Sequence, residues 1–177
     1  MGTIELKETL SKARIEGLDN TYFEQGKIKH CKFITAKKKV VLNMQLPKTL
    51  PLEQLLCFNH GLVQLIGCPV ELRISADVCD LDSGEMLKYC KFYSEHSRYG
   101  HVLKDAIPTV KDRIVDCLFT DEALKQQAQS CREELDHFMQ NVGITYDFEF
   151  SCRTASFTQI EVKMPKEAPK PQTNPSV

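Results

Sequence analysis

Apolar and polar residues alternate along two segments in the first half of the chain, and a helical pattern lies between them. The alternation over 40–46 and over 70–78 is typical of half-buried β-strands. Apolar positions over 52–66 instead follow the spacing of an amphipathic helix. Together with a basic strand over 27–36, this order predicts that 27–78 forms a small sheet with one helix covering one face.

The second half shows the same order of elements in shorter form. Alternation and capping residues predict a strand at 113–119, a helix at 121–142 and a strand at 144–150. A further helix is expected over 85–97, because Asp82 precedes it as a capping residue. The fold class predicted by this order is α+β, with two small sheet-and-helix domains.

Changes in composition set the expected domain boundaries. The first domain is predicted to span 1–80, with a short surface helix over 4–15 packed on it, and the second to span 81–152. The segment 153–177 is rich in proline and polar residues and lacks periodicity, so it is expected to be a disordered linker.

Charge and cysteine content narrow the class of protein. A net charge of −1 gives no overall attraction to nucleic acid, and no apolar run is long enough to span a bilayer. The eight cysteines include no Cys-x-x-Cys pair, so they are interpreted as reduced thiols in a cytoplasmic protein. Cys57 and His60 form the nearest metal-like fragment, but no second ligand pair stands at a zinc-finger spacing. We therefore expect no cofactor.

The densest positive charge lies on the predicted strand over 27–36 and on the turn after it. It consists of seven residues, the basic segment: Lys27, Lys29, His30, Lys32, Lys37, Lys38 and Lys39. Such a segment can contact phosphates or an acidic protein surface. Alternatively, it is a solvated turn and a charged edge strand that discourages aggregation.

A small enzyme is the remaining alternative. Asp77, Asp80 and Asp82 could hold a cation, although the other ligands of a calcium loop are missing and a solvated turn explains them. The five histidines fall in different predicted elements, and neither a nucleophile motif nor a phosphate loop occurs. The sequence therefore points to no catalytic residues.

Five segments carry a resemblance to a known family: the basic strand at 26–30, the strand end at 46–51, the helix start at 52–58, the strand at 70–74 and the segment 138–150. In order and in local sequence they resemble the N-terminal region of the PolC-type bacterial replicative DNA polymerase III alpha subunit. These segments concern the fold rather than catalysis.

The resemblance covers roughly residues 5 to 152 and implies a piece of a longer DNA-directed DNA polymerase with 3′–5′ exonuclease activity. It implies a first domain similar to the polymerase-binding end of the clamp-loader tau subunit and a second domain like a truncated KH fold. The expected role is a non-catalytic accessory region in DNA replication that binds a replisome protein, with tau as a candidate, or DNA.

The sequence departs from a working KH domain at one place. A KH domain holds four nucleotides through a Gly-x-x-Gly loop, and this chain contains no such motif. The alternative to a polymerase accessory region is a stand-alone KH-like nucleic-acid-binding module. It would use the basic segment, with Phe33 and Tyr22 available for stacking on bases.

Overall fold

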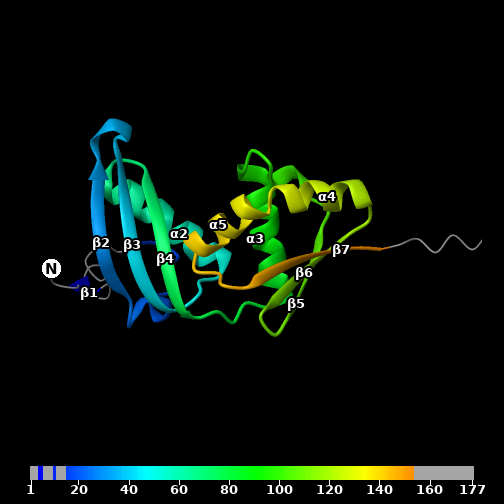
Figure 1. Cartoon of the computed structure of the whole chain (residues 1–177). Helices are drawn as coiled ribbons and strands as arrows, with labels where there is room; N and C mark the ends of the chain where they lie inside the picture. Colours follow the sequence, from blue (N-terminus) through cyan, green and yellow to red (C-terminus); the bar gives the residue numbers. More distant parts are fainter. Residues whose placement is uncertain (1–3, 6–9, 11–14, 154–177) are drawn as a thin grey trace, which may run out of the picture.

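The first half of the chain forms a four-stranded mixed sheet with helix α2 on its inner face. A computed structural model describes residues 4–5, 10 and 15–153 (Figure 1). The strand order is β1-β2-β3-β4, in which β1 and β2 are antiparallel, β2 and β3 are antiparallel, and β3 and β4 are parallel. The elements are β1 (Ile4–Glu5), β2 (Lys27–Ile34), β3 (Lys39–Lys48), α2 (Leu52–Ile66) and β4 (Val70–Val78).

Alternation along β3 decides which face of this sheet is buried. Val40, Leu42, Met44 and Leu46 are all buried in the core, as are the α2 residues Leu55 and Phe58. The side chains of the intervening β3 positions project from the opposite face. The sheet therefore has an inner face packed on α2 and an outer face built mostly from polar side chains.

The second half is a three-stranded sheet with three helices. Its strand order is β5-β6-β7, with β5 and β6 antiparallel and β6 and β7 parallel. The elements are α3 (Ser83–His96), β5 (Ile107–Lys111), β6 (Ile114–Phe119), α4 (Glu122–Ser130), α5 (Arg132–Asn141) and β7 (Asp147–Cys152). Short 3-10 helices lie at Asn20–Phe23, Thr35–Lys37 and Gly100–Leu103. This confirms the prediction of an α+β chain with two small sheet-and-helix units.

The predicted single helix over 121–142 is wrong. It is interrupted at Cys131, whose φ of −102° and ψ of 8° separate α4 from α5. The hydroxyl of Ser130 donates a hydrogen bond of 2.7 Å to the carbonyl oxygen of Gln127, the type of side-chain bond that bends helices. The apolar pattern continued across this break and hid it.

Three strand predictions also need correction. Strand β5 was missed, because its residues show no clean alternation. Ile4 and Glu5 form the edge strand β1 instead of starting the helix predicted over 4–15. Of the rest of that predicted helix, the structure describes two residues: Leu10 is buried and helical, and Ile15 lies outside a regular element. Ile144 is buried but precedes β7, which begins at Asp147.

The two units share one apolar core. A single cluster of buried side chains runs from the first sheet through α3 to the second sheet, and α5 packs against β4. Ile74 of β4 forms a parallel β-bridge with Val142, at the end of α5. Nearby, the buried hydroxyl of Thr49 donates a 2.9 Å hydrogen bond to the carbonyl oxygen of Gly143. The units are therefore joined by backbone and side-chain bonds as well as by apolar contact.

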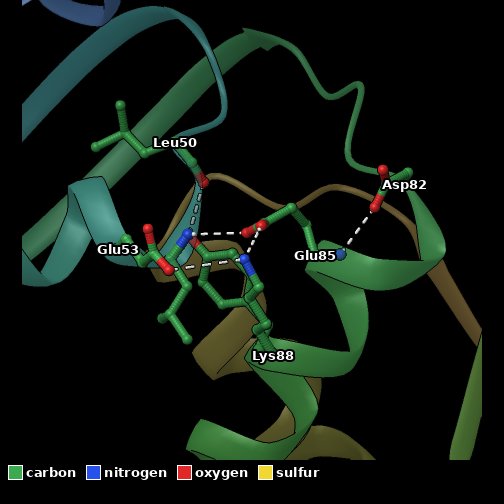
Figure 2. A network of polar contacts seen from close by, with 7 residues as sticks. Leu50, Glu53, Asp82, Glu85 and Lys88 are labelled. Atoms are coloured by element: carbon green, nitrogen blue, oxygen red, sulfur yellow. Dashed lines mark hydrogen bonds and ion pairs between the residues drawn. The ribbon is translucent and has the colours of Figure 1, made fainter. Parts of the chain in front are cut away.

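The N-terminus of α2 receives its cap from the second unit. Pro51 precedes the helix and offers no capping side chain, so the first N–H groups need an acceptor from elsewhere. Figure 2 shows Glu85 of α3 in that position, where its carboxylate accepts a 3.2 Å hydrogen bond from the N–H of Leu52. Lys88 holds the same carboxylate at 2.5 Å, and Asp82 caps α3 itself. A negative charge is also favourable at this end of a helix dipole.

Tyr89 makes the second contact between α3 and the segment before α2. Its hydroxyl is fully buried and donates a 2.8 Å hydrogen bond to the carbonyl oxygen of Leu50, which is also fully buried. Burial raises the pKa of Tyr89 well above its ordinary value, so the hydroxyl stays a donor.

We expect Tyr89→Phe to lower the free energy of unfolding by about 1 to 3 kcal/mol, because the buried Leu50 carbonyl loses its partner. Urea unfolding followed by circular dichroism measures this difference. Tyr99→Phe, at a side chain that is 39% exposed, is the matched control and should change stability by less than about 0.5 kcal/mol. Equal stability of the two variants would show that the Tyr89 hydrogen bond does not stabilise the joint.

Candidate binding surface

Strand β2 carries most of the basic segment and is exposed along nearly its whole length. Only Ile28 and Ile34 are half-buried, and the other six residues of the strand are exposed. The described part of β1 pairs only with Lys27 and Ile28. From His30 to Ile34 the described chain provides β2 with a partner on one side alone, which is β3.

A β-bulge at Lys29 decides which way the basic side chains point. Ile28 pairs with Met44, whereas His30 pairs with Asn43, so Lys29 is the extra residue. Lys27 lies opposite Gln45 on the outer face of the sheet. The extra residue shifts the alternation by one, so that the even-numbered residues after it take the outer face.

The bulge therefore brings basic residues on both sides of it to the same face. His30 and Lys32 lie opposite Asn43 and Val41, which also belong to the outer face. Without the bulge, Lys27 and Lys32 would point to opposite faces. The sequence does carry a signal for this shift, because the polar positions change from odd to even numbers at Lys29 and His30.

The remaining members of the basic segment separate into two kinds. Lys37 and Lys38 are exposed at the turn between β2 and β3, where Lys38 adopts a left-handed conformation with φ of 46°. Lys39 is different, because it forms an ion pair with Glu71 of β4. In the described part of the chain, no acidic side chain forms an ion pair with Lys27, Lys29 or Lys32.

Glu71 is the centre of a charged network on the outer face. Besides binding Lys39, it accepts hydrogen bonds of 2.9 and 2.7 Å from Nε and Nη2 of Arg73. Hydrogen bonds from Lys39 and then from Arg73 hold the pKa of Glu71 below its ordinary value of 4.5. One carboxylate thus pairs with two cations, Lys39 and Arg73, whereas the lysines of β2 have no such partner among the described residues.

The carboxylates considered for a cation site do not come together. Asp77 accepts a 2.6 Å hydrogen bond from Gln45, Asp82 caps α3, and Asp80 is exposed in the connection between β4 and α3.

All eight cysteines are free thiols, of which Cys90 and Cys117 are buried. Residues 4–5, 10 and 15–153 contain no group of three or more histidine, cysteine or acidic side chains placed to hold a metal ion. None of the helices in this part of the chain is long and apolar enough to cross a membrane.

A hollow that the sequence did not suggest lies between the end of α3 and α5. It has a volume of about 550 Å³. Its lining comes from the two helices and the residue after α3, and comprises Tyr93, His96, Ser97, Glu133, Glu134, His137, Phe138 and Asn141. Two histidines from separate helices, His96 and His137, line this hollow. Their distance along the sequence gave no indication that they would lie in one hollow. His96 stacks on Phe92, with ring centroids 4.1 Å apart, and its Nδ1 lies 2.8 Å from the Phe92 carbonyl oxygen. Phe92 is half-buried.

The hollow lacks the arrangement of a nucleophilic active site. Its aromatic walls and two exposed glutamates can hold an apolar or cationic group. In the described structure, no serine or cysteine is hydrogen-bonded to either of its histidines. Strand β2 is the stronger candidate for a binding surface, because among the described residues its lysines have no ion-pair partner and its edge from His30 to Ile34 has no pairing strand.

No protein-family model, curated protein or solved structure matches this chain. The residues of β2 and their neighbours are therefore the basis on which a function can be proposed.

We expect Glu71→Gln to lower the free energy of unfolding near pH 7, because its carboxylate is stabilised by Lys39 and Arg73. A lowered pKa in the folded state means that this contribution is present above pH 4.5 and is lost as the pH falls through the folded-state value. The difference from the unaltered protein should therefore shrink below pH 4.5 in denaturant titrations at several pH values. A difference that is constant with pH would contradict the assignment.

The same Glu71→Gln variant should bind a single-stranded oligonucleotide more tightly at low salt, by about three- to tenfold, the effect of about one added phosphate contact. The reason is that Lys39 and Arg73 lose their carboxylate partner beside β2. Fluorescence anisotropy measures the affinity, and Glu122→Gln, which releases Lys125 on α4, is the matched control. Equal or weaker binding by Glu71→Gln would argue against phosphate contact on the outer face.

Proposed function

We propose that this chain is a non-catalytic accessory region of a PolC-type replicative DNA polymerase and acts in the cytoplasm during DNA replication. In this proposal it binds a replisome protein, with the clamp-loader tau subunit as the first candidate, or DNA. Nucleotidyl transfer and proofreading would belong to other parts of the parent polymerase.

The observation that carries the proposal is the uncompensated positive charge along β2. Lys27, His30 and Lys32 share the outer face of the sheet, while Lys37 and Lys38 extend the charge to the turn. Positive charge along an exposed strand supports a contact with phosphates or with an acidic protein surface. The sequence resemblance to the PolC N-terminal region favours the replisome as the place of that contact.

The alternative is a stand-alone KH-like nucleic-acid-binding module. The exposed ring of Phe33, 55% accessible beside Lys32, favours this reading because aromatic rings stack on bases. The missing Gly-x-x-Gly motif argues against a KH-type clamp on four nucleotides. Moreover, α4 and α5 are separated by Cys131 alone, so there is no loop between these two helices that could act as such a clamp.

An NMR titration of the ¹⁵N-labelled chain with a short single-stranded DNA tests the proposal, first at low and then at moderate salt. We expect saturable shifts of the amides between Lys27 and Lys39 that weaken as salt rises, because phosphate contacts release counterions. The clamp-loader tau subunit is the second titrant. Shifts that map to the same strand and persist at moderate salt would favour protein binding there.

The charge-reversal variant Lys32→Glu provides the control for location, and Lys111→Glu on the exposed edge strand β5 is its matched partner. Loss of shifts in the first variant alone supports β2 as the contact. If neither DNA nor tau shifts the β2 amides of the unaltered chain, the proposed role of this strand is wrong.

A further inference from the structure

We propose that β2 binds an acidic, extended segment of a partner protein as an added β-strand, on the edge from His30 to Ile34. This inference rests on the proposed function, since it specifies how the accessory region would contact a replisome protein. Its evidence is the pairing of β2, the direction of its side chains and its charge.

The first step concerns backbone hydrogen bonds. In an antiparallel pair, successive residues alternate between pointing their N–H and C=O groups toward the partner strand and pointing them away from it. The ladder with β3 continues to the last residue of β2, where Ile34 pairs with Lys39. The described part of β1 pairs no further than Ile28. Along His30 to Ile34, an ordered strand therefore presents outward backbone groups that no described segment uses, which is the requirement for strand addition.

The second step concerns charge, which selects the partner. Lysines on an edge strand prevent pairing with another copy, because like charges would lie directly opposite one another. Lys29 and Lys32 have this effect on β2, and neither forms an ion pair within the described residues. The same charges favour an incoming strand that carries glutamate or aspartate. A strand that repels its own copies but attracts acidic segments is suited to a heterologous partner.

The third step concerns the opposite face of β2. Cys31 and Phe33 pair with Leu42 and Val40, so they belong to the inner face, yet both are exposed. Phe33 is 55% accessible. An added strand with acidic residues on the outer face and apolar residues on the inner face would match Lys32 and Phe33 at the same time.

The test uses the full chain and an acetylated eight-residue peptide that alternates glutamate with valine. We expect saturable binding by isothermal titration calorimetry and slower hydrogen exchange of β2 amides over His30 to Ile34 in the complex. Lys32→Glu should weaken binding by about tenfold or more, because it places like charges opposite one another. The matched Lys111→Glu variant should stay within about twofold, because β5 belongs to the other sheet.

Two control ligands separate strand addition from simple charge attraction. The same peptide with every backbone amide N-methylated keeps its charges but cannot pair, so it should not bind. Equal binding of the methylated peptide would overturn strand addition.

If single-stranded DNA shifts the β2 amides but the peptide does not bind, the inference fails while the proposed role of the basic strand stands. If tau shifts the same amides without slowing their hydrogen exchange, strand addition is again overturned and protein docking remains. If none of these ligands binds β2, both proposals fail.

Discussion

The contact between α3 and the start of α2 is the constraint on which the rest of the structure depends. Helix α2 begins after a proline and has no capping side chain of its own, so its first N–H groups require an acceptor from elsewhere. Glu85 supplies that acceptor from the other unit, and Tyr89 ties the preceding Leu50 carbonyl to the same helix. Because α2 covers the inner face of the first sheet, fixing its start also fixes the position of that sheet relative to α3. The buried core then extends across both units.

This arrangement leaves the two faces of the first sheet with different tasks. The inner face is used for packing, whereas the outer face contains Glu71 with its two cations and, beside them, the uncompensated lysines of β2. The charged residues of the outer face fall into two groups with different roles. The network around Glu71 stabilises the folded chain, while Lys27 and Lys32 have no stabilising partner among the described residues. Side chains that do not contribute to folding in this way are available for binding.

Much of the fold could be predicted from local sequence. Strand β4 and helix α2 were predicted with the bounds that the structure has, because alternation or helical spacing ran without interruption between clear start and stop residues. The prediction that Asp82 caps α3 is also confirmed. Prediction failed where the local pattern gave no sign of the actual structure, as at Cys131, where the apolar periodicity continued through a break in the helix.

The sequence by itself determined the types of the main elements and the identity of the basic residues, because periodicity and charge are local properties. Tertiary structure alone decided which of those residues act together. Glu71 lies 32 positions from Lys39 along the chain, yet pairing of β3 with β4 sets them side by side and removes Lys39 from the free charge. Likewise, the sequence indicates a shift in alternation near Lys29, but only pairing with β3 makes it a bulge that turns Lys27 and Lys32 to the same face. Strand register and bulges arise from pairing between distant segments, and for that reason they are set by the folded sheet.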